Sequence, residues 1–316
     1  MNTSIIPVQR PGSRRPGFRR VLAAAATAAV VMAASACSQT GAATSSASAG
    51  AITTEVPPLA VDSAAAALLP QSVKSSKTLR VAIPTNEPPT QFYQEGTQNM
   101  VGLNPDVARL LGQALGVQVQ IDVANFDSII PGIAAGRYDA TVSSMSPTAE
   151  RGKVLDFVDY AQFGSGVAVP QGNPLGLNEK SLCGKKVGFL TASYQLRTDV
   201  PKFDEACLAA GKEKIQSNEY QDTRQAISAL SSGRLDAVLA DSPILNYAAT
   251  QNPAIQIGAS YDVAEVGIGV AKGENLVKAV AKAMQTVLRS EAYGAVLKKY
   301  GLSTSAIPDA RVNFFQ

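Results

Sequence analysis

Hydrophobic and polar positions follow two alternating patterns from Thr78 onward. Short runs rich in β-branched residues, which are typical of strands, alternate with longer runs whose apolar residues recur at the spacing of one helix face. A first set predicts strands over 78–83, 117–123 and 138–144 and helices over 105–115 and 126–136. A second set predicts strands over 185–190, 214–220 and 236–240 and helices over about 194–210 and 223–233. The alternation predicts an α/β fold.

The two sets also share a local pattern. A Gly that ends a helix is followed by Arg, one further residue, Asp and an apolar strand, as in GRYDATV (136–142) and GRLDAVL (233–239). This near-repeat predicts two similar lobes joined by a hinge, with ligand in the cleft between them at the carboxyl ends of the strands. The alternative is that Gly-Arg-x-Asp is merely common turn chemistry.

The end of the chain completes the predicted domain organisation. A helical pattern over about 274–300 is expected to pack on the first lobe after the chain recrosses near 261–270. Lobe 1 is therefore predicted to comprise residues 76–164 and 264–316, and lobe 2 residues 165–263.

The first 37 residues have the three-part pattern of a secretory signal. Five arginines precede a charge-free apolar run at 21–36, which is shorter than the roughly 20 residues of a membrane span. The run ends in Ala-Ser-Ala-Cys (34–37), which resembles the lipobox of bacterial lipoproteins, although Ala stands where Leu is usual. Acylation of Cys37 would anchor the protein to the outer side of the cell membrane. The alternative is a plain signal peptide, and the arginine pairs leave both the general secretory and the twin-arginine route open.

Residues 38–75 are predicted to be a flexible tether with a short helix at 62–69. The part up to about residue 55 consists largely of Ser, Thr, Ala and Gly, which cannot bury enough surface to order itself.

Composition narrows the classes of function. Of 28 basic residues, five lie in the segment expected to be removed, which leaves 23 against 25 acidic residues and no basic patch, so nucleic-acid binding is disfavoured. The chain has no His, which excludes Ser-His-Asp and Cys-His mechanisms and removes the commonest zinc ligand. We therefore expect no metal and no cofactor. Enzymatic activity is disfavoured, because only Asp, Glu, Lys, Tyr or a thiol remains as acid or base.

Cys183 and Cys207 remain once Cys37 is assigned to lipid. Two leftover cysteines in an exported protein favour a disulfide, with two free thiols as the alternative.

Five segments in order resemble the family 3 extracellular solute-binding proteins of amino-acid ABC importers, which have the type II periplasmic-binding-protein fold. They are TNEPPTQF (85–92), VGLNPDVARLLGQALGV (101–117), FDSIIPGIAAGRYDATVSSMSPTAERGKVLDFVDY (126–160), CGKKVGFLTASYQ (183–195) and LDAVLADSPI (235–244).

The resemblance implies a site for a free amino acid. Arg151 offers a planar fork of donors that suits a carboxylate. Ser146 lies where a strand is expected to give way to a helix at Pro147 and Thr148, so that free N–H groups and a helix dipole would support the same anion. The second-lobe turn is expected to do likewise through Ala192, Ser193 and Tyr194.

Other positions correspond to the ammonium and side-chain parts of such a site. The resemblance assigns Asp241 and the carbonyl of Ser144 to the ammonium, and Phe126 to the ligand side chain. The alternatives are an exposed helix charge for Arg151, a helix N-cap for Asp241 and simple core for Phe126.

The sequence departs from the family pattern where specificity is decided. Glu87 stands where many relatives have an aromatic residue before Pro-Pro, and Pro84 where they often have Asp. Glu87 is predicted to be an ammonium partner or to contact a cationic or polar ligand, or alternatively to lie on the exposed lip. Ala192 replaces the usual Gly and adds a methyl near the carboxylate site.

The resemblance implies a monomeric receptor that binds a small polar amino acid and delivers it to a membrane permease driven by a separate ATPase subunit. No phosphate-binding Gly-x4-Gly-Lys-Ser/Thr loop occurs in the chain. The alternatives are a dehydratase-like enzyme with Glu87 or Asp241 as acid or base, a ligand sensor, and a receptor for a compatible solute.

Overall fold

The computed structural model describes residues 54–273 and 275–315. The predicted signal segment, Cys37 and most of the predicted tether lie outside the described residues. The short helix expected at 62–69 is α1, Ser63–Ala67, and the Asp62 side chain caps it by accepting from the Ala65 amide. Helix α2, Gln71–Ser76, follows and leads into the sheet.

Eight strands of the described chain form one sheet in the order β4-β1-β5-β10-β6-β9-β7-β8. Their bounds are β1 Thr78–Ile83, β4 Gln118–Val123, β5 Ala140–Met145, β6 Leu155–Pro170, β7 Lys186–Leu190, β8 Gln216–Tyr220, β9 Ala237–Asp241 and β10 Ile255–Ala271. β1 pairs in parallel with β4 and β5, and β7 pairs in parallel with β8 and β9. Strands β2, Phe92–Tyr93, and β3, Met100–Val101, form a separate hairpin.

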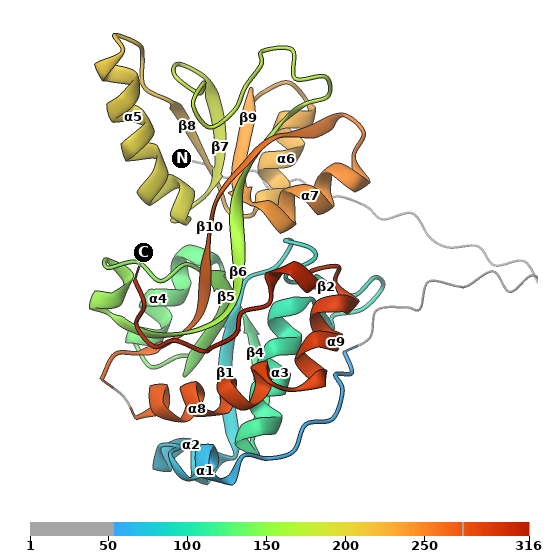
Figure 1. Ribbon diagram of the computed structural model, residues 1–316, viewed down its shortest axis with the longest axis vertical. Coiled ribbons are helices and arrows are strands. Elements are labelled where there is room, and N and C mark those ends of the chain that lie inside the picture. The colour runs from blue at the N-terminus through green and yellow to red at the C-terminus, as the bar shows by residue number, and fades with distance from the viewer. Residues whose placement is uncertain (1–53, 274, 316) are drawn as a thin grey trace, which may run out of the picture. The chain divides into compact units, whose positions relative to one another are not determined.

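The long strands β6 and β10 connect the two lobes. They pair antiparallel along most of their length and run through the middle of the molecule from one set of parallel strands to the other (Figure 1). Their register shifts between Ile257 and Ala259, between Tyr261 and Ala264 and again between Val266 and Gly267. Such irregularities bend paired strands locally, so the crossover is the natural place for a hinge.

Each lobe has its own buried apolar clusters on both faces of its sheet. In the first lobe, α3 (Leu103–Leu115), α8 (Leu276–Leu288) and α9 (Glu291–Lys299) cover one face, and α4 (Phe126–Ala134) covers the other. In the second, α5 (Val200–Ala209) lies on one face, and α6 (Thr223–Ser231) and α7 (Ser242–Gln251) lie on the other. Successive residues of β6 serve opposite faces, as the twofold period of a strand requires.

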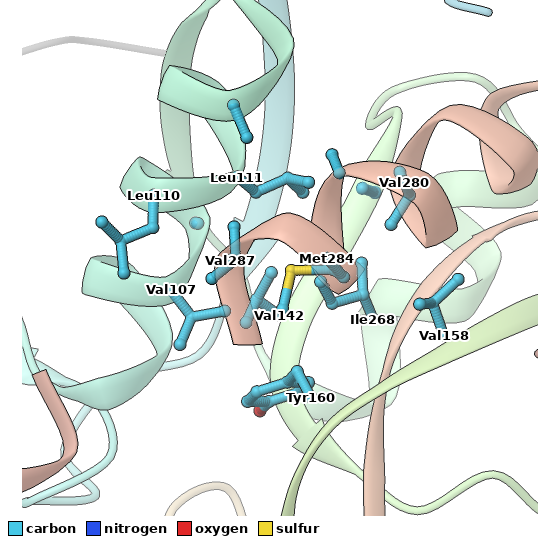
Figure 2. Close-up of a cluster of buried hydrophobic side chains, with 14 of the residues drawn as sticks. Val107, Leu110, Leu111, Val142, Val158, Tyr160, Ile268, Val280, Met284 and Val287 are labelled. Carbon is cyan, nitrogen blue, oxygen red and sulfur yellow. The ribbon is translucent and has the colours of Figure 1, made fainter. Parts of the chain in front are cut away.

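The return of the C-terminal helices to the first lobe is confirmed. Figure 2 shows Val280, Met284 and Val287 of α8 beside Leu110 and Leu111 of α3, over side chains of β5, β6 and β10. The helical stretch is divided into two helices because the Ser290 side chain caps α9 by accepting from the Tyr293 amide.

One helical prediction was wrong, and another was confirmed in its bounds but has an irregular first turn. The helix expected after Ser146 is a single 3-10 turn, Arg151–Lys153, because β6 begins at Leu155 and leaves no room for a second turn. The helix expected over about 194–210 starts as a wide turn over Gln195–Asp199 before α5. Pro201 lies at the start of α5 and has no N–H to donate to the preceding turn, which accounts for the irregular start.

The predicted disulfide is present between Cys183 and Cys207, and it ties the segment before β7 to α5. Within the described ranges, we find no helix with the length and apolar character needed to cross a membrane.

Candidate functional site

A cavity lies where the carboxyl ends of β5, β7 and β9 meet, between side chains of both lobes. About 370 Å³ of the space within it, the part open to solvent included, is not filled by protein atoms. Its walls are formed by Glu87, Phe126, Ser143, Ser144, Ser146, Arg151, Leu190, Ser193, Tyr194, Gln195, Thr223, Ala240, Asp241 and Ile244.

The structure brings eight of the nine residues predicted for the ligand site to this cavity, namely Arg151, Ser146, Ser144, Asp241, Phe126, Glu87, Ser193 and Tyr194. The ninth, Ala192, is not among the lining residues, but its carbonyl oxygen accepts a hydrogen bond from Arg151 Nη2 at 3.0 Å. All nine therefore lie in one neighbourhood, although they come from segments up to 154 positions apart, from Glu87 to Asp241.

Arg151 contacts both lobes. Its Nη1 donates to the Ser146 carbonyl at 2.8 Å on its own lobe, and its Nη2 donates to Ala192 on the other. The centre of the guanidinium lies 5.5 Å from the centroid of the Phe126 ring. Burial lowers the pKa of Arg151 to about 10, so the group stays a cation at neutral pH. The interpretation as an exposed helix charge is wrong, since Arg151 is partly buried in a 3-10 turn.

The structure supplies little helix dipole at Arg151. The single turn over Arg151–Lys153 cannot align enough peptide groups, so we base the anion site on the guanidinium. One amide of the second-lobe turn differs from expectation, because the Ser193 amide donates to the Leu190 carbonyl at 3.0 Å and is engaged within the turn. Ala192 takes a left-handed φ of 61° there, a conformation that favours Gly.

Asp241 lies at the end of β9 and at the N-cap position of α7, but its side chain makes no capping hydrogen bond. Instead, its Oδ1 accepts from Gln195 Nε2 at 3.0 Å, beside the cavity. The interpretation as a helix cap therefore holds for its backbone position only. Burial raises the pKa of Asp241 to about 6, which Gln195 and Arg151 oppose.

Glu87 is 3% exposed and lines the cavity, so the interpretation as an exposed lip residue is wrong. Its Oε2 accepts from Gln91 Nε2 at 2.6 Å and its Oε1 accepts from the Thr223 hydroxyl at 2.7 Å. Burial raises the pKa of Glu87 to about 7, and Asp241 and Asp222 add to the rise.

Ser144 and Phe126 are held by the first lobe. Ser144 has a left-handed φ of 54°, its amide donates to the Tyr160 hydroxyl at 2.9 Å, and its Oγ accepts from Asn104 Nδ2 at 2.9 Å. Phe126 is 8% exposed, packs against Ile129 and Phe157, and also lines the cavity, so it belongs both to the core and to the cavity wall.

Thr223 was missing from the predicted site, and Gln195 was included only as the last residue of the family-like segment 183–195. Thr223 is the first residue of α6, shortly after β8, and Gln195 begins the wide turn before α5. A helix start after the carboxyl end of a parallel strand was the available signal for Thr223, because ligands bind at that edge of a sheet. Elsewhere in the described chain, no three His, Cys, Asp or Glu side chains gather as a metal site.

Comparison with known proteins agrees with this architecture. Residues 79–303 match the family model of the bacterial extracellular solute-binding proteins, family 3. The chain belongs to this family. The match covers both sets of parallel strands and every residue that lines the cavity, so this solute-binding protein shares the two-lobed fold and the extracytoplasmic location of its family.

Individual relatives are similar over most of the chain. The arginine-binding protein ArgT of Corynebacterium glutamicum is 26% identical over 78% of this chain and 82% of its own length. A probable histidine-binding protein of Campylobacter jejuni is 25% identical over 71% of this chain and 85% of its own. An ancestral arginine-binding protein bound to arginine superposes with a TM-score of 0.65 at 29% identity, over 71% of this chain and 98% of that one.

Proposed function

We propose that this solute-binding protein is the receptor of an amino-acid ABC importer, with Arg151 binding the ligand carboxylate and Asp241 binding its ammonium. The observation that carries the proposal is that these two opposite charges, one from each lobe, face one small cavity. Two of the five N–H donors of Arg151 bond to carbonyl oxygens, which leaves donors for a carboxylate. A desolvated zwitterion needs both partners, because an unpaired buried charge is costly.

A second carboxyl group in the cavity indicates the kind of ligand side chain. Glu87 and Asp241 supply two carboxyl groups beside the one guanidinium of Arg151. An α-carboxylate and an α-ammonium leave Glu87 unmatched, so the cavity favours a compact polar amino acid whose side chain offers N–H or O–H donors and disfavours acidic ligands. The ligands named for the two relatives, arginine and histidine, both carry N–H donors on the side chain.

Ligand binding is proposed to close the lobes. We place lobe 1 at residues 76–164 and 264–316 and lobe 2 at 165–263, because the register shifts of β10 lie around these boundaries. The closed form would dock on a membrane permease driven by an ATPase subunit, and acylated Cys37 would hold the receptor at the membrane.

Calorimetry on the chain from Ser38 onward, titrated with the common amino acids, tests the proposal. A compact polar amino acid is expected to bind, and Arg151→Ala is expected to weaken it by at least about 2 kcal/mol, or roughly 30-fold, because a buried carboxylate loses its partner. Arg137→Ala is the matched control, since Arg137 is exposed on the same lobe. Wild-type affinity in Arg151→Ala would refute the assignment.

Glu87→Gln tests the side-chain assignment in the same experiment. The variant is expected to lose preference for side chains that donate hydrogen bonds and to bind acidic amino acids less poorly. A uniform change in affinity across acidic, neutral and basic amino acids would place Glu87 outside the specificity contacts.

The anchor has its own test. Cys37→Ser is expected to move the full-length protein from the membrane fraction to the soluble extracytoplasmic fraction. An unchanged membrane fraction would refute lipidation and leave the receptor assignment untouched.

A dehydratase-like enzyme is the second candidate, because a buried carboxyl with a pKa of about 7, as Glu87 has, suits an acid or base in a cleft. The bound amino acid incubated with the protein is expected to be recovered unchanged by NMR. If the amino acid instead lost water, and Glu87→Gln abolished this reaction, the result would favour a dehydratase-like enzyme over a receptor.

A further inference from the structure

Residues near the C-terminus pair with β6, next to the turn that carries Arg151. We call residues 310–315 the C-terminal segment. Val312 pairs with Val158 of β6 in an antiparallel bridge, and the Asp159 amide donates to the Arg311 carbonyl at 3.0 Å. Figure 1 shows this segment, in red, running back across the first lobe toward the side on which α4 lies.

Asn313 anchors the C-terminal segment with both backbone and side chain. Its amide donates to the Phe157 carbonyl at 3.0 Å, and its Oδ1 accepts from the Phe157 amide at 2.9 Å. Its Nδ2 donates to Asp156 Oδ1 at 3.0 Å. Asn313 has a left-handed φ of 53°, which Asn tolerates better than most residues. These contacts fix the direction in which the C-terminal segment continues beyond its pairing with β6.

The segment ends on Gly152, the residue after Arg151. The Phe315 ring lies so close over the Gly152 α-carbon that a methyl group added there would come within 2.5 Å of two ring carbons. On the same turn, the Gly152 carbonyl accepts from Lys272 Nζ at 2.6 Å. Lys272 also forms an ion pair with Asp156, whose carboxylate accepts the hydrogen bond from Asn313 Nδ2. Lys272 and Asn313 therefore share the Asp156 carboxylate.

The turn that carries Arg151 needs such support. It is one 3-10 turn of three residues, and a single turn has little stability of its own. A shift of the turn would move the guanidinium away from its contacts at Ser146 and Ala192.

We infer that Asn313 and Phe315 are positioning residues, which hold the Arg151 turn where the guanidinium reaches across the cleft. The affinity of the receptor for a carboxylate ligand is then set partly by the end of the chain. The inference rests on the proposed function only in its effect on affinity, because the position of the turn is a property of the protein alone.

Hydrogen exchange without ligand tests the positioning directly. The amides of Gly152, Lys153 and Val154 donate to the carbonyls of Thr148, Glu150 and Arg151. In Phe315→Ala their exchange is expected to accelerate at least about fivefold while the exchange of β1 and α3 stays unchanged. Phe314→Ala is the matched control, because the centroid of the Phe314 ring lies 3.6 Å from the guanidinium carbon of Arg311, whereas the ring over Gly152 is that of Phe315. Unchanged exchange in Phe315→Ala, or equal acceleration in both variants, would overturn the inference.

A conservative variant of Phe315 and a variant of its contact partner Gly152 distinguish positioning of the turn from general destabilisation of the protein. Phe315→Leu is expected to restore slow exchange of the turn. Gly152→Ala would displace the Phe315 ring. In the wild-type background it is expected to accelerate exchange of the turn amides, and in the Phe315→Ala background it is expected to cause no further acceleration. Independent, additive effects of the two changes would contradict a direct contact.

The effect on binding is measured as a double-mutant cycle with Arg151→Lys. Phe315→Ala and Asn313→Ala are each expected to weaken amino-acid binding at least about fivefold with Arg151 present and less than about twofold in the Arg151→Lys background. Equal losses in both backgrounds would show that the C-terminal segment does not act through the guanidinium. Failure of the wild type to bind any amino acid would refute the proposed function, while the exchange experiment would still decide the positioning.

Discussion

Glu87 and Thr223 lie on opposite lobes and are joined by a hydrogen bond of 2.7 Å between carboxylate and hydroxyl. Beside it, Asn86 Nδ2 donates to Asp222 Oδ2 at 3.3 Å. With the bond from Arg151 to Ala192, these contacts connect the lobes around the cavity. One of the residues by which this chain departs from its family pattern is therefore also a contact between the lobes, and we expect a change at Glu87 to alter both ligand preference and lobe closure.

Removing the Thr223 hydroxyl is expected to destabilise the protein. Thr223→Val keeps the shape but leaves buried Glu87 with one partner fewer, at a cost of about 1–3 kcal/mol. The same bond opposes the rise in the pKa of Glu87, so the variant is expected to raise that pKa further. Urea unfolding measures the first effect and NMR titration of the carboxyl the second. Ser228→Ala, at an exposed position of α6, is the control, and equal stability of the two variants would contradict the prediction.

Stability of the ligand-free protein is expected to fall as the pH rises through 7. Burial raises the pKa of Glu87 from 4.5 to about 7, so the folded state binds a proton that the unfolded state has released. The stabilisation is complete below about pH 4.5 and is lost as the pH rises to about 7, by at most about 1.4 kcal/mol per pH unit.

In Glu87→Gln, the stability is expected to depend little on pH above pH 6. Below pH 6 it is still expected to fall as the pH rises, because Asp241, Asp159 and Asp199 have pKa values raised to about 6. Thermal unfolding from pH 5 to 8 checks this, with exposed Asp127→Asn as the control. A slope above pH 6 that persists in Glu87→Gln would show that another group titrates there.

Ala192→Gly is expected to stabilise the protein by about 0.5 kcal/mol. The φ of 61° at Ala192 costs a residue with a Cβ about 1 kcal/mol, part of which is offset by the greater freedom of Gly in the unfolded chain. Ala135→Gly, where φ is −86°, is expected to destabilise instead. Urea unfolding of both variants gives the comparison, and the same sign at both positions would contradict the argument from φ.

Replacing both Cys183 and Cys207 with Ser is expected to cost about 3–4 kcal/mol of stability, since the bond closes a loop with a sequence separation of 24. Neither sulfur lines the cavity, so the affinity for ligand is expected to stay within about twofold of wild type. Denaturant unfolding and calorimetry of the same preparation check both. A large loss of affinity at unchanged stability would contradict this separation.

The sequence by itself determined the elements and the class of fold. Strands and helices such as β1, α3 and β9 lie within about two residues of their predicted bounds, because period and local propensity are properties of adjacent residues. The sequence also indicated the disulfide, and it predicted the nine residues that the structure gathers around one cavity. Motifs at the ends of strands allow this, since topology brings those ends together.

Only the tertiary structure decided what depends on residues far apart in the chain. Burial of Glu87 and its bond to Thr223 involve a separation of 136 residues, and no local pattern encodes such a pairing. The shortening of the expected helix to one turn at Arg151, and the support of that turn by Phe315, likewise arise from packing against β6 and the C-terminal segment. Local periodicity fixes which elements form, but the environment of a charge is set by whichever distant segments surround it.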